Sequence, residues 1–214
     1  QSAKGRTDPD GKLTVPEGEE TARHSAYIMG YRDGTFGPGR SMTRAEVSAI
    51  FARLLAAKRG NAIPAAAGTK FVDIPSAAWY SGYVKYLADY GVAYGRTKDR
   101  FAPNEAITRA EFVAMTVRFF DVYGDGSQEI MERYKDFDDV SDGYWAAAYI
   151  KAAAKYGWVT GYTDGTFRGD SEINRAEVVT IVNRLLGREA DADYIADHLS
   201  RLNARQREAV LAVD

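Results

Sequence analysis

Apolar residues recur along the chain in three stretches with the spacing of one face of an α-helix. Within residues 47–55, 112–120 and 178–186 they follow an i, i+3, i+4, i+7, i+8 pattern, with one threonine among them. This period indicates three amphipathic helices of similar length. Each helix opens on nearly the same letters, MTRAEVSA, ITRAEFVA and INRAEVVT. The three stretches are therefore copies of one internal repeat.

A second helical element precedes two of these stretches. Residues 71–91 read FVDIPSAAWYSGYVKYLADYG and residues 137–157 read FDDVSDGYWAAAYIKAAAKYG. Each closes on a glycine, a residue typical of the left-handed position that ends a helix. A short turn then leads to the next helix, as in GYRDGTFGP at 30–38 and GYTDGTFRG at 161–169. Asp-Gly in these turns predicts a tight turn or small hairpin.

The repeating unit is thus a helix, a turn segment and a second helix. One such unit is too small to bury both apolar faces, so we expect the copies to pack around one another. The predicted fold is mainly α, with three helix-turn-helix repeats in a pseudo-three-fold bundle joined by short turn or hairpin segments. The expected boundaries are a disordered lead-in at 1–22, repeat 1 at 23–59, repeat 2 at 71–122, repeat 3 at 137–187 and a C-terminal helix at 191–214.

The first copy lacks its first helix. Counting back 65 residues from Trp79 leads to Thr14, within DGKLTVPEGEE, where there is no apolar face. The last letters of the chain, AVD, resemble the openings FVD at 71 and FDD at 137. We therefore expect a completing helix after Asp214, and an incomplete first repeat would allow chains to exchange a helix.

The recurring letters TRAE predict a capping box at each helix start. A threonine or asparagine at the N-cap and a glutamate three residues later satisfy each other's backbone N–H groups, and the cap stabilises by roughly 1 kcal/mol. The predicted capping residues are Thr43 and Glu46, Thr108 and Glu111, and Asn174 and Glu177.

Capping does not explain the arginine between them, which is Arg44, Arg109 or Arg175. A cation at the first helical position is mildly unfavourable because the helix dipole is positive there. One interpretation pairs the arginine with a nearby acid such as Asp73 or Asp139. The other makes it, with the free N–H groups of the helix start, a site for a carboxylate or phosphate. On that second interpretation, exchange to alanine weakens ligand binding and leaves folding nearly intact.

The recurring aromatic residues also allow two interpretations. Trp79 and Trp145, each followed one turn later by a tyrosine, are either core residues or a stacking surface for sugar rings at a groove edge. The turn residues Phe36, Phe101 and Phe167 are expected to pin their turns to the core.

Composition narrows the function classes. The chain has 214 residues, a formal charge of -2 and no cysteine, which gives no electrostatic case for nucleic acid and excludes thiolate metal sites and thiol catalysis. No apolar run approaches the roughly 20 residues of a membrane span, and the first residues lack the apolar stretch of a signal peptide. The two histidines, His24 and His198, form no catalytic or zinc pattern. We expect no enzyme, no metal site and no cofactor. The DGT turns lack the alternating acids of a calcium loop.

Taken together, the unit FxD…W…I…G…GYxDGTFxP…ITRAE resembles the S-layer homology domain, in three copies over about residues 24–190. The resemblance is to surface proteins of clostridium-like bacteria, which implies a secreted protein of the cell wall or S-layer. It further implies a pseudo-trimeric bundle whose inter-repeat grooves bind a secondary cell-wall polysaccharide, often one with a pyruvate ketal.

Carried over onto this chain, the resemblance implies a set of ligand-binding residues. They are Arg44, Arg109, Arg175, Asp33, Gly34, Asp164, Gly165, Trp79 and Trp145. Copy two departs from the pattern, with YGRTKDRF in place of GYxDGTF, so its groove is expected to be altered or inactive. The competing hypothesis is a self-assembly module of a surface layer, in which exposed faces pair protein with protein.

Overall fold

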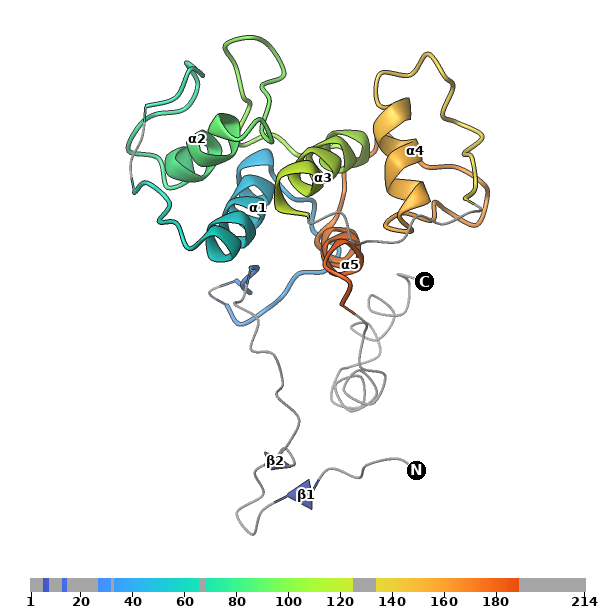
Figure 1. The fold of residues 1–214 in the computed structure, drawn as a ribbon, viewed down its shortest axis with the longest axis horizontal. Helices are drawn as coiled ribbons and strands as arrows, with labels where there is room; N and C mark the ends of the chain where they lie inside the picture. The colour runs from blue at the N-terminus through green and yellow to red at the C-terminus, as the bar shows by residue number, and fades with distance from the viewer. Residues whose placement is uncertain are drawn as a thin grey trace.

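Five α-helices make up nearly all the regular structure of the described residues in the computed structural model (Figure 1). The structure describes residues 6–7, 13–14, 27–31, 33–65, 68–124 and 134–188. The helices are α1 (Arg44–Arg59), α2 (Ser81–Asp89), α3 (Arg109–Tyr123), α4 (Ala147–Lys155) and α5 (Arg175–Leu185). The prediction of a mainly α fold built from helical repeats is therefore confirmed.

Two strands of two residues each lie near the N-terminus. Strand β1 (Arg6–Thr7) pairs antiparallel with β2 (Leu13–Thr14). Both fall within residues 1–22, and the rest of that segment lies outside the described residues. The predicted C-terminal helix at 191–214 also lies outside them, so these two predictions stay open.

The first helix of each complete repeat packs on the second helix of the repeat before it. Figure 1 shows α2 beside α1 and α4 beside α3, and these are the two most extensive helix pairings. The predicted glycines after α2 and α4 are left-handed, with φ of 71° at Gly91 and 70° at Gly157. Within the described part of the chain, α5 has no comparable helix beside it. That place corresponds to the first helix that the sequence pattern leads us to expect is missing from repeat 1.

A closed ring of main-chain hydrogen bonds joins the three repeats at the centre. Met42 N donates to Ile173 O at 3.1 Å, Ile173 N donates to Ile107 O at 3.1 Å, and Ile107 N donates to Met42 O at 2.9 Å. Each residue immediately precedes the N-cap of its helix, so the helix starts converge here. The ring gives the bundle its pseudo-three-fold arrangement.

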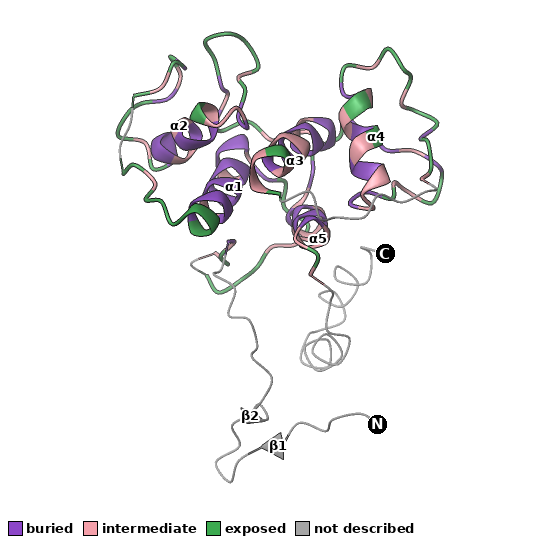
Figure 2. Ribbon diagram, in the orientation of Figure 1, coloured by how far each residue is buried: buried purple, intermediate pink, exposed green. Residues whose placement is uncertain are grey.

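The core lies between the helices that follow these caps. Figure 2 shows α1 and α3 mostly buried, and the Phe51 ring lies 5.7 Å from that of Phe112 and 4.8 Å from that of Phe119. Two of the expected turn anchors, Phe101 and Phe167, are fully buried. The third, Phe36, is 39% exposed, so the first turn is seated less deeply than the others.

Candidate functional site

Each of the three second helices begins with a capping box. In α1, Glu46 N donates to Thr43 Oγ1 at 3.2 Å and Thr43 N donates to Glu46 Oε2 at 2.8 Å. Thr108 with Glu111 starts α3 in the same way, and so does Asn174 with Glu177 in α5. The pattern of caps is therefore present in all three copies. It leaves the arginine between the cap residues to be explained.

The backbone N–H groups that follow each cap are not free. Arg44 N donates to Glu105 O at 3.0 Å and Ala45 N donates to Pro103 O at 2.9 Å, both in the next repeat. The start of α3 is bonded to repeat 3, and the start of α5 is bonded to repeat 1, in the same manner. This corrects the idea of an anion site built on free N–H groups at the helix start. Neighbouring carbonyl groups already accept those hydrogen bonds.

The arginine after each cap is buried and reaches across to the next repeat. The Arg44 side chain is 4% exposed. Its Nε donates to Phe101 O and its Nη2 to Tyr94 O, both at 2.7 Å, and Nη1 lies 3.3 Å from Glu111 Oε2. Arg44 therefore ties repeat 1 to both the turn and the helix cap of repeat 2.

Arg109 makes the equivalent connection from repeat 2 to repeat 3. Its Nε donates to Phe167 O at 2.9 Å, and its Nη1 donates to Glu177 Oε1 at 2.8 Å. The capping glutamate thus has a second role, as the ion-pair partner of the preceding arginine. Sequence reasoning missed this role because it treated each cap within its own helix.

The acids proposed as arginine partners, Asp73 and Asp139, bind backbone instead. Asp73 accepts from Phe101 N at 2.8 Å and from Ala102 N at 2.7 Å, and Asp139 does the same in repeat 3. Burial acts to raise the pKa of Asp73, but the two backbone donors outweigh it and hold that pKa below its ordinary value. The interpretation that pairs the arginine with a nearby acid therefore holds for Arg44 and Arg109, but the acid is the capping glutamate of the next repeat and not Asp73 or Asp139.

The third arginine, Arg175, is buried without the full set of bonds. Its Nη2 donates to Met29 O at 2.7 Å, but its Nε has no hydrogen-bond partner. The guanidinium carbon lies 4.7 Å from the ring centroids of Tyr31 and Phe36. Where Arg44 and Arg109 contact the next repeat, the turn that accepts the hydrogen bond from Nε is held in place by Asp73 or Asp139. The described residues of repeat 1 include no such acid ahead of its turn.

The turn residues proposed for ligand binding stabilise their own turns. Asp33 Oδ1 accepts from Thr35 N and Oγ1, and Asp164 Oδ1 accepts from Thr166 in the same way. Hydrogen bonds from the threonine side chains hold the pKa of both carboxyl groups below the ordinary range. The glycines Gly34 and Gly165, with φ of 79° and 89°, allow these turns. None of these four residues lines either of the two grooves described below.

The two tryptophans are exposed, which corrects the interpretation that they are core residues. Trp79 is 58% exposed and Trp145 is 54% exposed. Each ring lies against a tyrosine, Trp79 at 6.2 Å from Tyr83 and Trp145 at 6.0 Å from Tyr144. Large exposed rings held in place by neighbours are suited to stacking on a ligand.

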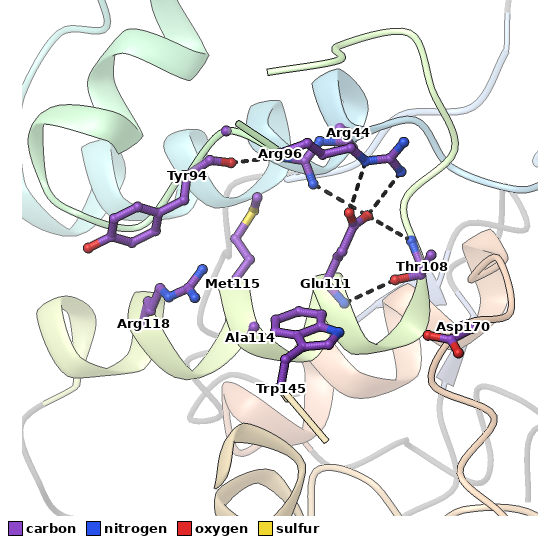
Figure 3. A pocket seen from close by; sticks show the side chains of 11 residues that line it. Arg44, Tyr94, Arg96, Thr108, Glu111, Ala114, Met115, Arg118, Trp145 and Asp170 are labelled. Carbon is purple, nitrogen blue, oxygen red and sulfur yellow. Dashed lines mark hydrogen bonds and ion pairs between the residues drawn. The ribbon is translucent and has the colours of Figure 1, made fainter. Parts of the chain in front are cut away.

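The cavity that we call the first groove lies where repeats 1, 2 and 3 meet around α3, with a volume of about 480 Å³ (Figure 3). Trp145 stands on one side and Tyr94 on the other, and Glu111 lies between Arg44 and Arg96. The charged side chains that line it are Arg44, Arg96, Arg118, Glu111 and Asp170. The lining thus holds one more cation than anions.

Glu111 is the electrostatic centre of the first groove. Arg96 Nε lies 3.0 Å from Glu111 Oε1, and Arg44 Nη1 lies 3.3 Å from Oε2 of the same carboxylate. Burial acts to raise the pKa of Glu111, but the hydrogen bond from Arg96 and the charge of Arg44 outweigh it and hold that pKa below its ordinary value. Arg96 also pairs with Glu105 at the groove rim.

A smaller cavity, the second groove, lies at the joint of repeats 2 and 3, with a volume of about 260 Å³. Arg109 and Glu177 stand where the first groove has Arg44 and Glu111, and Tyr162 stands in the place of Arg96. Tyr162 Oη donates to Glu177 Oε1 at 2.8 Å. Arg184 is a further cation in the lining.

Sequence reasoning missed a second recurring arginine. Arg53, Arg118 and Arg184 each stand nine residues after the arginine of the cap motif. Arg118 lines the first groove and Arg184 the second. The signal was present in the repeat alignment, on the polar side of the amphipathic helix.

Two classes of site are not found in the described residues. They contain no cluster of histidine, cysteine or acidic side chains arranged to hold a metal ion. No described helix is long and apolar enough to span a membrane.

Comparison with known proteins shows that the repeats match a known domain family. The profile of the S-layer homology domain matches residues 20–48, 70–113 and 136–179, which is more than half of the chain. A cellulosome-anchoring protein of Acetivibrio thermocellus is 35% identical over 87% of this chain and 41% of its own length. The S-layer protein EA1 of Bacillus anthracis is 26% identical over 92% of this chain and 22% of its own length.

An enzyme is also among the relatives. An amylopullulanase of Thermoanaerobacterium thermosulfurigenes is 30% identical over 77% of this chain and 8% of its own length. The chain therefore spans less than half of each of these relatives. The similarity concerns the repeats and not the remainder of those larger proteins.

Proposed function

Because the chain belongs to the S-layer homology domain family, we propose that it is a non-catalytic module that anchors a surface protein to the bacterial cell wall. In this proposal an anionic secondary cell-wall polysaccharide, such as one with pyruvate ketals, binds in the grooves between repeats. The relatives named for cellulosome anchoring and for the S-layer support a location at the cell surface.

The observation that carries the proposal is the chemistry of the first groove. It combines an excess of cationic side chains with the exposed ring of Trp145. Sugar rings offer apolar faces for stacking, and a ketal carboxylate offers the charge that a guanidinium binds in a bidentate manner. Arg44 and Trp145 are the two predicted ligand residues that line this groove. Arg109 has the corresponding place in the second groove.

The enzyme among the relatives supports an anchoring role over a catalytic one. Proteins named as an anchoring protein, an S-layer protein and an amylopullulanase share similarity over this chain's repeats. A segment common to such different proteins is best explained by their shared placement at the cell surface. The chemistry that distinguishes them is then carried by the rest of each protein.

Removing the polysaccharide from the wall tests the proposal. The protein is incubated with isolated cell walls before and after extraction of the secondary polysaccharide, and the bound fraction is measured by co-sedimentation. Binding is expected to disappear with the polysaccharide. Binding that persists on the extracted walls would support the alternative of protein-to-protein assembly.

Among the described residues α5 has no extensively packed helix beside it, which bears on the alternative that chains associate. A first helix for repeat 1, supplied by another part of the polypeptide or by a second chain, would pack on α5 as α2 packs on α1. Sedimentation equilibrium distinguishes the two sources, because a helix supplied by a second chain makes the apparent mass depend on concentration, whereas a helix supplied by the same polypeptide does not.

A further inference from the structure

The charges of the first groove do not cancel evenly. Arg44 and Arg96 both lie against Glu111, and Arg96 also pairs with Glu105, so two cations face two anions. The Asp170 carboxylate at the rim accepts a hydrogen bond from Tyr144 Oη at 2.6 Å. Arg118 alone among the groove's arginines pairs with no carboxylate in the described part of the chain.

Arg118 is nevertheless held in a defined orientation. Its guanidinium carbon lies 4.5 Å from the ring centroid of Tyr94 and 4.6 Å from that of Tyr149. Its Nε and Nη2 donate to Tyr149 Oη at 3.2 Å and 3.0 Å. A guanidinium placed between aromatic rings keeps its charge and presents a flat edge. Nη1 has no hydrogen-bond partner among the described residues.

The position of Arg118 relative to Glu111 separates two roles. Both residues extend from α3, two turns apart, or about 10 Å along the helix axis. Figure 3 shows the bonds to Arg44 and Arg96 converging on Glu111, whereas Arg118 lies beyond Met115, close to Tyr94. The paired arginines therefore hold the repeats together at one end of the groove. The unpaired one faces the groove at the other end.

We infer that Arg118 is the residue of the first groove that binds the anionic group of the ligand, whereas Arg44 acts mainly as the tie between repeats. This inference rests on the proposed function, since it names the cationic side chain that binds the anionic group of the wall polysaccharide. A carboxylate meeting Arg118 displaces no existing ion pair. A carboxylate meeting Arg44 would compete with Glu111 for a guanidinium that already has three partners.

The other repeats support the assignment independently. Arg53 lies 5.1 Å above the Tyr83 ring and its Nη2 is 3.4 Å from Tyr83 Oη, the same pairing that Arg118 makes with Tyr149. Like Arg118, Arg53 and Arg184 form no ion pair with a described carboxylate. An unpaired arginine on this helix face is thus a feature of all three repeats.

A site-resolved titration tests the role of Arg118. The chain has three tryptophans, and of these only Trp145 lines the first groove. The indole N–H signal of Trp145, identified by Trp145→Phe, reports binding at this groove in an NMR titration. The two probes are wall fragments with the pyruvate ketal and the same fragments after mild acid has removed it.

The wild-type protein is expected to prefer the ketal-bearing fragment. Arg118→Gln should weaken the binding of that fragment at least about tenfold, because a charged hydrogen bond is lost. The affinity for the ketal-free fragment should stay within about twofold of wild type, because stacking is kept. Arg118→Lys should restore part of the preference. The matched control is Arg96→Gln, which removes a paired arginine from the same groove and should keep the preference.

Each other outcome contradicts either the role of Arg118 or the location of the site. A preference unchanged in Arg118→Gln, or lost only in Arg96→Gln, would assign the charge recognition to another residue. Equal weakening of both fragments would give Arg118 a packing role alone. If the wild-type Trp145 signal responds to neither fragment while the protein still binds intact walls, the first groove is not the site. Failure of the proposed function is distinct, because wall binding then persists after polysaccharide extraction.

Discussion

The first and second grooves are built on one plan, but the capping glutamate has a different second partner in each. In each, a buried arginine crosses to the capping glutamate of the next repeat, Arg44 to Glu111 and Arg109 to Glu177. The first groove adds Arg96 as a second cation on that glutamate, where the second groove has the neutral hydroxyl of Tyr162. The turn of repeat 2, which departs most from the repeat pattern, therefore gives its groove a third arginine, although the lining of each groove holds one more cation than anions.

The aromatic residues differ as well. Trp145 is half exposed at the side of the first groove, whereas Trp158 in the second groove is fully buried among Tyr156 and Phe120. The first groove is also the larger, at about 480 Å³ against about 260 Å³. A deviation from the repeat pattern thus changes the chemistry of a groove without closing it.

The largest expected effect comes from removing the arginine ties. Arg109→Ala should lower the free energy of unfolding by about 3–5 kcal/mol, because Glu177 would be left partly buried with no cation. Arg44→Ala should cost less, since Arg96 still neutralises Glu111. Urea unfolding followed by circular dichroism measures both, with the exposed Arg100→Ala as the control. Equal losses in the two variants would mean that the second cation does not matter.

These values replace the earlier expectation that folding is nearly intact without these arginines. That expectation treated the residue as a surface cation at a helix start. Its burial and its bonds to the next repeat make it part of the interface between repeats.

A smaller effect is expected when the exposed ring is removed. Trp145→Ala should weaken binding of the ketal-bearing fragment roughly tenfold, because a stacking surface is lost. The midpoint of thermal unfolding should change little, since more than half of this side chain is in solvent. Calorimetric titration measures the affinity, and Val72→Ala, another exposed apolar residue, is the control. An unchanged affinity would show that stacking on Trp145 does not contribute to binding.

The smallest expected effect is on the stability of the protein at acid pH. The pKa of Glu111 is lowered in the folded protein, so its contribution to stability is present above the ordinary glutamate pKa and is lost as the pH falls through the folded value. Arg96→Tyr, which gives the first groove the partner found in the second, should make this loss shallower because it brings the folded pKa closer to the unfolded one. Urea midpoints between neutral pH and pH of about 3 measure the slope. A slope unchanged by Arg96→Tyr would show that Arg96 does not set this pKa.

Periodicity and local chemistry carried the prediction of the helices. The apolar spacing, the caps and the closing glycines depend on residues within a few positions of one another, and these features are present in the structure. The roles of Arg44 and Asp73 depend on contacts 57 and 28 residues away along the chain, to Phe101 in both cases. Reasoning confined to one helix or one turn has no access to such contacts.

The site residues were predictable only in part. Trp145 and Arg44 do meet in one groove, but Asp33 and Asp164 recur because their turns need them, which a repeat alignment cannot distinguish from a ligand role. Arg118 recurs as regularly as Arg44 and was overlooked because an arginine on the polar face of a helix is ordinary. Its neighbours Tyr94 and Tyr149, from two different repeats, make it unusual, and only the folded chain brings them together.

The ring formed by Met42, Ile107 and Ile173 has a consequence for the number of repeats in the module. Each residue gives one main-chain hydrogen bond and receives one, so the ring closes with three members and with no other number in this geometry. Losing one repeat would leave a donor and an acceptor unmatched at the centre, and adding one would leave it outside the ring. The three main-chain hydrogen bonds at the centre are therefore all satisfied only when three repeats are present together.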